Sequence, residues 1–186
     1  MTRKLLLDHG LGLFEEKGYP ATTVDDIAAA AGTTRATFYL HFPSKAELMR
    51  SLVERSNMLL VGPDAPPLPE VIERGDREQI KIWLARKFDQ WKDIRPYVIA
   101  AHQAAASEPD IQAALDQWFD GVISDIVDGL NRAGRFDAES RRVRGTLAFG
   151  QLEFFSRRWF GHGWDMDREM SLELMTDSWC GLLTEG

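Results

Sequence analysis

The spacing of apolar side chains constrains the fold of this chain more than any other feature of its sequence. Apolar residues recur at helical spacing in nearly every segment, as do Leu6, Leu13 and Phe14 in a helix predicted over residues 2–17. Sustained alternation of apolar and polar residues with β-branched enrichment, the pattern of strands, does not occur. Hydrophobic residues make up 44% of the 186 residues, which is typical of a folded chain. We therefore predict an all-α protein.

A cluster of prolines divides the predicted helices into two groups. Pro63, Pro66, Pro67 and Pro69 crowd the segment Val61–Pro69. Because proline interrupts helices and favours extended or turn conformations, we interpret this segment as a linker. Further helices are predicted over residues 23–31, 34–40 and 44–60 before the linker, and over residues 77–91, 95–107, 109–131, 138–160 and 167–183 after it.

The net charge of −7 is not spread evenly over the two groups. Residues 1–50 carry six basic and six acidic side chains, so residues 51–186 hold the whole excess of acidic residues. A uniformly basic surface for nucleic acid is therefore excluded, and any polyanion must be bound by a local patch.

The segment from Thr23 to Phe42 has the spacing of a helix-turn-helix. A helix, a tight turn at Gly32 and a second short helix follow one another, and such helices cross steeply enough for the second to enter a DNA major groove. Phe38 and Phe42 are expected to anchor the second helix to the core, because so short a helix is not stable alone. Its polar residues Thr34, Arg35 and Thr37 can bond base edges or phosphates.

The sequence FEEKGYPATTVDDIAAAAGTTRATFYLHFPSKAELM resembles the N-terminal signature of the tetracycline-repressor (TetR) family of transcriptional regulators, over about residues 5–50. The resemblance implies a three-helix DNA-binding domain at residues 1–50, with its helix-turn-helix at about 23–42. A fourth helix would join it to a helical-bundle domain at residues 51–186. The family implies a homodimer that binds a palindromic double-stranded DNA operator, usually represses, and releases DNA when a small molecule enters the second domain.

The resemblance also assigns roles to individual residues of the first domain. Thr23 would bind a phosphate at the start of its helix, and Lys45 would bind one as a point charge. Thr33 stands where the family often has an apolar residue, and His41 has the alternative of packing against the core. The predicted DNA-binding residues are Thr23, Thr33, Thr34, Arg35, Thr37, Tyr39, His41 and Lys45.

The second domain holds all six tryptophans, which can line a cavity or simply fill a core. His102 likewise has the alternative of a hydrogen-bonded core histidine. The resemblance implies an effector pocket enclosed by the helices at 77–91, 95–107, 109–131 and 138–160. The candidate pocket residues are Trp83, Lys87, Trp91, His102, Gln103, Trp118, Phe149 and Phe154.

The helices at about 138–160 and 167–183 carry apolar stripes that exceed the needs of one subunit. We predict that they form the dimer interface, and the family resemblance implies a four-helix bundle with two helices from each subunit. Gly145 and Gly150 would allow the helices to approach closely. The stripes consist of Val143, Leu147, Leu152, Phe155 and Trp159 in the first helix, and Leu172, Met175, Trp179 and Leu182 in the second.

Several classes of protein are disfavoured by what the sequence lacks. Motifs of phosphate-binding loops, dinucleotide sites, serine hydrolases and zinc proteases do not occur, so we predict no enzyme and no cofactor. Cys180 is the one cysteine, and the group His162, Asp165 and Asp167 is interpreted as a solvated loop, not a metal site. Without a membrane-length apolar run or a signal-peptide pattern, we expect a cytoplasmic protein with no membrane partner.

These observations favour a ligand-responsive, dimeric transcriptional repressor. One alternative is a helical-bundle small-molecule carrier or enzyme that keeps the N-terminal fold, and it would not bind a specific DNA sequence. A second alternative is an activator, or a regulator that needs a co-repressor, and only the sign of the ligand effect would distinguish it.

Overall fold

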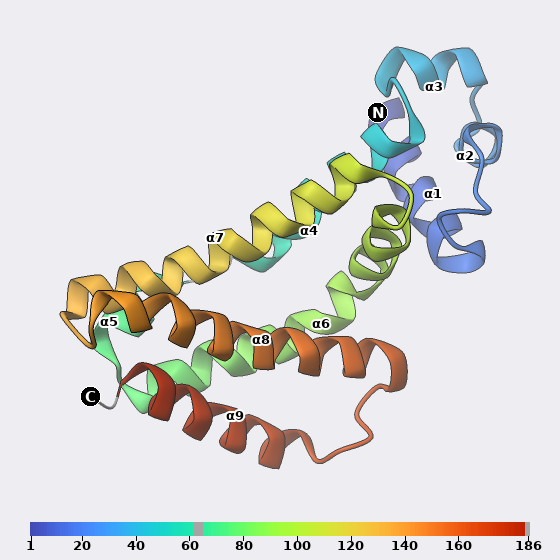
Figure 1. Cartoon of the computed structure of the whole chain (residues 1–186). Helices are drawn as coiled ribbons and strands as arrows, with labels where there is room; N and C mark the ends of the chain where they lie inside the picture. Colours follow the sequence, from blue (N-terminus) through green and yellow to red (C-terminus); the bar gives the residue numbers. More distant parts are fainter. Residues whose placement is uncertain (62–64, 185–186) are drawn as a thin grey trace. The chain divides into compact units, whose positions relative to one another are not determined.

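The computed structural model describes residues 1–61 and 65–184, and all regular structure in these ranges is α-helical (Figure 1). The all-α prediction is confirmed. The helices are α1 (Thr2–Lys17), α2 (Val24–Ala30), α3 (Arg35–His41), α4 (Lys45–Val61), α5 (Leu68–Arg74), α6 (Arg77–Ala105), α7 (Pro109–Ala133), α8 (Ala138–His162) and α9 (Arg168–Leu183).

Local capping explains where several of these helices begin. The backbone N–H of Asp26 donates to the Thr23 hydroxyl, and the Asp26 carboxylate accepts the Thr23 backbone N–H, which forms a capping box at α2. Asp137 and Asp167 are the N-caps of α8 and α9, and the carboxylate of each accepts the backbone N–H of the residue three positions later. The predicted helix ends lie within two residues of the observed ones, apart from the two differences described next.

The predicted break between residues 91 and 95 is wrong, because α6 runs unbroken through Pro96. An interior proline costs about 3 kcal/mol in a helix, since it removes a hydrogen bond and clashes with the preceding turn. Ile94 and Tyr97 on either side of it are buried, and their packing offsets this cost.

The predicted linker is only partly extended. Its last residues, Leu68 and Pro69, already belong to α5, and Pro67 is the N-cap of that helix. Prolines are tolerated there because the first N–H groups of a helix have no partner within the helix. Residues 62–64 of the predicted linker lie outside the described residues.

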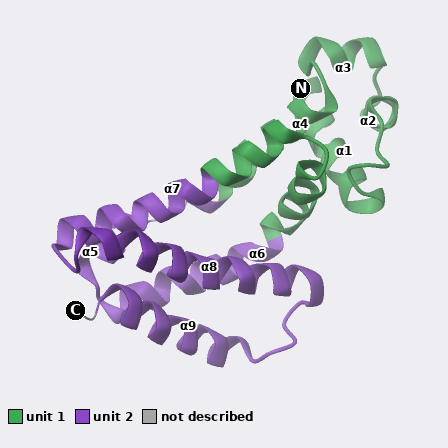
Figure 2. Ribbon diagram, in the orientation of Figure 1, with its two compact units in different colours: residues 1–59, 93–117 green, residues 60–92, 118–186 purple. Residues whose placement is uncertain are grey.

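The chain forms two compact units, shown in green and purple in Figure 2. Unit 1 contains residues 1–59 and 93–117, so the last part of α6 and the first part of α7 belong with the N-terminal helices. Its core is built from apolar residues of α1 to α4 and the segments between them, among them Leu6, Phe14, Tyr19, Ile27, Phe38, Phe42 and Leu48.

Unit 2 contains residues 60–92 and 118–186, and its helices α8 and α9 pack against each other. Trp179 of α9 is fully buried and lies against Trp83, with ring centroids 5.5 Å apart and the rings tilted by 31°. It donates its indole N–H to the carbonyl of Ala148. Gly145 packs closely against α7, because an added Cβ would lie 3.4 Å from Ile126. Gly145 thus serves packing within the subunit. None of the described helices is both long enough and apolar enough to cross a membrane.

Candidate functional site

The helices α2 and α3 form a helix-turn-helix around Gly32. Gly32 has φ +65°, a conformation that side chains with a Cβ rarely adopt, and Thr33 donates its backbone N–H to the carbonyl of Ala28. The buried side chains of Ile27 and Phe38 hold the two helices to the core. The opposite side of α3 faces solvent, so it can contact another molecule.

The hydroxyl groups that were predicted to face a groove are paired with each other. Thr34 is the N-cap of α3, and its Oγ1 accepts the backbone N–H of Thr37. The same Oγ1 lies 3.0 Å from the hydroxyl of Thr37. This pairing stabilises the first turn of α3, so both side chains have a structural role in addition to any contact with DNA.

Arg35 is exposed but already has two partners. Its Nη1 donates to Asp25 Oδ2 at 2.9 Å, and its Nη2 donates to the hydroxyl of Tyr39 at 3.4 Å. Tyr39 and then Asp25 raise the pKa of this guanidinium, which is charged at any physiological pH. The geometry therefore brings Asp25, Arg35 and Tyr39 together on the solvent side of the helix-turn-helix.

Lys45 lies at the start of α4, where its ammonium group binds the corner between α1 and α2. Its Nζ donates to the carbonyls of Tyr19 at 2.8 Å and Thr22 at 2.9 Å, and it lies 4.0 Å from the Tyr19 ring centroid. Burial lowers the pKa of Lys45, an effect that the charge of Glu108 partly opposes. Two of the three N–H donors of this ammonium group are thus used to hold the fold.

The remaining predicted DNA-binding residues lie at the edges of the same surface. Thr23 is exposed and caps α2, and Thr33 is half-buried in the turn. His41 is exposed at the end of α3, so the alternative of a core histidine does not hold.

Leu40 is a prominent residue of this surface that is not among the predicted DNA-binding residues. Leu40 is 83% exposed, and its neighbour one turn earlier, Ala36, is also exposed. At 100° per residue, Leu40 lies almost opposite Phe38 and Phe42, the two residues that face the core. The helical period alone could therefore have identified it.

The predicted effector residues divide between the two units. His102 and Gln103 belong to unit 1, where Gln103 Oε1 accepts the backbone N–H of Tyr19 and His102 Nδ1 lies 2.8 Å from the carbonyl of Val98. Phe154 is 71% exposed on the surface of α8. These three side chains thus take part in local contacts or face solvent.

The other candidates are in unit 2 and are largely surrounded by aromatic rings. Trp91 lies 4.4 Å from Phe88 between ring centroids, and Lys87 is buried with its Nζ on the carbonyl of Leu60. Trp83 packs near Trp179, and Trp118 lies against Phe149. Within the described residues, the buried Nε1 of Trp118 has no acceptor.

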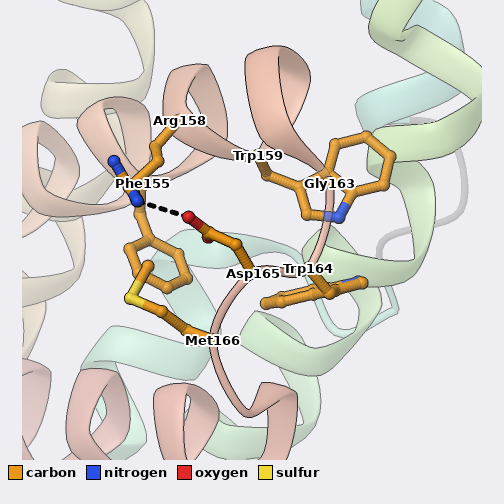
Figure 3. Close-up of a pocket in the computed structure, with 7 residues that line it drawn as sticks. All are labelled: Phe155, Arg158, Trp159, Gly163, Trp164, Asp165 and Met166. Carbon is orange, nitrogen blue, oxygen red and sulfur yellow. Dashed lines mark hydrogen bonds and ion pairs between the residues drawn. The ribbon is translucent and has the colours of Figure 1, made fainter.

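A shallow surface pocket lies elsewhere in unit 2, where α8 ends and the chain turns toward α9 (Figure 3). It encloses no space for even a water-sized molecule, and the Arg158–Asp165 ion pair crosses it. None of the predicted effector residues lines it. Its lining consists of Phe155, Arg158, Trp159, Gly163, Trp164, Asp165 and Met166.

The apolar surface of α8 and α9 differs in part from the predicted stripes. Leu152, Leu172 and Trp179 are buried inside the subunit, and Trp179 of α9 donates its indole N–H to the Ala148 carbonyl of α8. Val143 and Leu147 are exposed as expected. The exposed apolar residues of the two helices are Val143, Leu147, Phe154, Met170 and Leu174, and Gly150 has open space beside it.

Residues 6–52 match the family model described as bacterial regulatory proteins, tetR family. The chain is 41% identical over 49 residues to the biofilm operon negative transcriptional regulator IcaR of Staphylococcus epidermidis, which is 26% of each chain. The alignments to the first curated relatives cover only about a quarter to a third of those proteins. The matched residues contain the whole helix-turn-helix.

Solved structures of similar fold cover nearly the whole chain. A TetR-like transcriptional regulator from Rhodococcus sp. RHA1 has a TM-score of 0.70 at 20% identity, covering 99% of this chain and 97% of that chain. A complex of SmeT, the repressor of a Stenotrophomonas maltophilia multidrug efflux pump, with triclosan has a TM-score of 0.74 at 19% identity, covering 95% and 90%. At such identities these similarities establish the fold.

Proposed function

We propose that this chain is a member of the TetR family of bacterial regulatory proteins, whose model matches residues 6–52, and that it is a homodimeric transcriptional repressor that a small molecule releases from a palindromic operator. Residues 1–50 would bind DNA, and residues 51–186 would bind the effector and form the dimer. As a regulator that acts on a bacterial chromosome, it would work in the cytoplasm.

The observation that carries this proposal is the exposed face of α3 on a well-anchored helix-turn-helix. Phe38 and Phe42 hold the helix to the core, while Arg35, Tyr39 and Leu40 face solvent. In this arrangement the second helix enters the major groove and the first helix crosses the backbone. We propose that Arg35 faces the groove and that Thr33 lies at the edge of the groove. The other proposed contacts to phosphates and base edges are made by Thr23, Thr34, Thr37, Tyr39, His41 and Lys45.

A second copy of the chain is the proposed partner of the exposed apolar residues on α8 and α9. Val143, Leu147 and Phe154 follow one another at helical spacing on α8, and Gly150 leaves room between Leu147 and Phe154 for a close approach. A two-fold axis would pair this face with itself. Such a dimer would place two α3 helices on half-sites about one DNA turn apart, roughly 34–36 Å.

The effector is proposed to be an apolar or aromatic small molecule bound among the aromatic side chains of unit 2. The aromatic surroundings of Trp83, Trp91 and Trp118 and the unpaired Nε1 of Trp118 support this class of ligand. Of the similar proteins, SmeT has been solved with triclosan, which is itself aromatic. The effector would act by binding more tightly to a conformation in which the two DNA-binding heads are misplaced.

Selection of duplexes from a random pool, followed by a mobility-shift assay, tests the proposal. The wild-type protein is expected to enrich a palindrome, and Arg35→Ala should lower the affinity for it at least tenfold without loss of helicity by circular dichroism. Arg74→Ala, which removes an exposed arginine of α5, is the matched control and should bind like the wild type. If the selection enriches no sequence, a small-molecule carrier or an enzyme is favoured. If an added small molecule makes the protein bind the operator more tightly, a co-repressor mechanism is favoured.

A further inference from the structure

The hydrogen-bonding groups on α3 are largely engaged before any DNA is bound. Thr34 and Thr37 are paired with each other, and Arg35 is held between Asp25 and Tyr39. Each contact of these groups with a base edge must therefore replace or share an existing hydrogen bond. Such an exchange yields less binding free energy than a contact made by a group without a partner.

The apolar groups on the same face make no comparable internal contact. Leu40 is 83% exposed, more than any other large apolar side chain except that of Met1 among the described residues. Ala36, one turn earlier, is exposed too. A single exposed leucine is common on proteins, but this one forms an apolar strip with Ala36 in the middle of the proposed DNA-reading surface.

The major groove offers one apolar feature to such a strip, which is the C5-methyl group of thymine. Residues four positions apart in a helix are separated by about 6 Å along the axis, and neighbouring base pairs are about 3.4 Å apart. Leu40 and Ala36 can thus reach methyl groups on adjacent base pairs or on base pairs two steps apart.

We propose, on the premise that the protein is a DNA-binding regulator, that Leu40 and Ala36 determine operator specificity by contacting thymine methyl groups at neighbouring positions of each half-site. Leu40 fills the gap next to one methyl group, and the Cβ of Ala36 contacts the other. Arg35 keeps further N–H donors for a base or a phosphate, while Asp25 and Tyr39 fix its direction.

The test replaces single thymines by deoxyuridine in the duplex that the full chain selects, because this removes one methyl group and leaves the base pairing unchanged. Fluorescence anisotropy should show about a fourfold loss of affinity at each contacted thymine, the value of one buried methyl group. The Leu40→Ala variant should bind the thymine and deoxyuridine duplexes equally well at one of these positions, because the side chain that contacts the methyl group there is gone. Replacing that A·T pair by G·C should weaken binding less when its cytosine carries a 5-methyl group.

Met58→Ala provides the matched control, since it shortens another exposed apolar side chain, on α4. This variant should keep the full sensitivity to deoxyuridine. If deoxyuridine has no effect at any position, or if Leu40→Ala keeps every effect, the assignment of Leu40 and Ala36 is overturned while the proposed function stands. If no duplex is selected at all, the proposed function itself fails.

Discussion

At the scale of single residues, the charge of Arg35 is balanced by that of Asp25 on the exposed face of the helix-turn-helix. Both side chains are about 60% exposed, so solvent screens the pair and it adds little to stability. Its larger effect is on the local field, because a carboxylate beside the guanidinium weakens attraction to phosphates. Asp25 should therefore limit binding to DNA of any sequence.

Replacing Asp25 by asparagine should raise non-specific affinity and reduce the ratio of specific to non-specific binding. The variant frees one positive charge, so the slope of log K against log salt should become steeper by about one phosphate contact. Titrations of a random duplex at several salt concentrations measure this slope. The control is Asp8→Asn, which removes the ion pair between Asp8 of α1 and Arg55 of α4 and should leave the slope unchanged. An equal change of the slope in both variants would refute a local role for Asp25.

At the scale of elements, the corner between α1 and α2 is fastened, within unit 1, to the last turn of α6 and to Glu108 in the segment just before α7. The Tyr19 hydroxyl donates to Glu108 at 2.9 Å, and the Tyr19 backbone N–H donates to Gln103. Lys45 joins the same corner from α4. Because α2 begins directly after this corner, these contacts determine where the helix-turn-helix is held relative to α6 in unit 1.

Tyr19→Phe should destabilise unit 1 by about 1–3 kcal/mol at pH 7, since it removes a hydrogen bond to a charged group. Burial, and then Glu108, raises the pKa of Tyr19 above its ordinary value of 10. Its stabilising effect is therefore complete below pH 10 and is lost as the pH rises further. Urea unfolding between pH 7 and 11 should show an alkaline loss of stability in the wild type that is smaller in Tyr19→Phe. Lys45 titrates in both proteins, so its contribution to the pH dependence is the same in each. An equal alkaline loss of stability in the wild type and in Tyr19→Phe would contradict this role of Tyr19.

Two glycines of α7 provide a matched test of packing in unit 2. A Cβ on Gly129 would lie 2.6 Å from both Ile72 Cβ and the carbonyl oxygen of Pro69, whereas a Cβ on Gly121 would meet nothing within 4 Å. Gly129→Ala should thus cost about 1–3 kcal/mol through overpacking against α5. Gly121→Ala should stabilise the helix by about 0.5–1 kcal/mol. Thermal unfolding of both variants measures the difference, and similar melting temperatures would mean that α5 does not pack there.

At the scale of the whole molecule, two-fold assembly would explain the apolar residues that α8 and α9 leave exposed. An exposed strip of several large apolar side chains is unusual in a monomer. Reading a palindrome also needs two copies of α3. Assembly and operator binding should accordingly be lost together when this surface is changed.

Phe154→Glu should convert the proposed dimer to a monomer at micromolar concentration, because it places a charge where an apolar face would be buried. Phe154 is 71% exposed, so the monomer should remain folded. Sedimentation equilibrium and operator binding are the two measurements. The control is Ile82→Glu, which changes an exposed apolar residue of α6; a monomeric wild type, or a dimeric Phe154→Glu, would contradict the interface.

Much of the fold follows from interactions between residues close in sequence. The helices that follow Thr23 and Asp167 begin there because these residues are N-caps. The turn at Gly32 depends on the positive φ of that residue, and the inward position of Phe38 depends on the 3.6-residue helical period. All these effects act within about four residues. The helix-turn-helix, with its short second helix, could therefore be predicted from the chain alone. The continuity of α6 through Pro96 could not, because it depends on packing around Ile94 and Tyr97.

The helices and the helix-turn-helix thus follow from the order of residues along the chain, whereas the packing of the helices controls which side chains are available to a partner. Asp25 and Arg35 lie ten residues apart, and Lys45 and Tyr19 twenty-six, yet each pair is in contact. Their pairing requires the helices to be packed against one another, and helical periodicity does not specify that packing. The same packing leaves Leu40 exposed, because only the other side of α3 contacts the core.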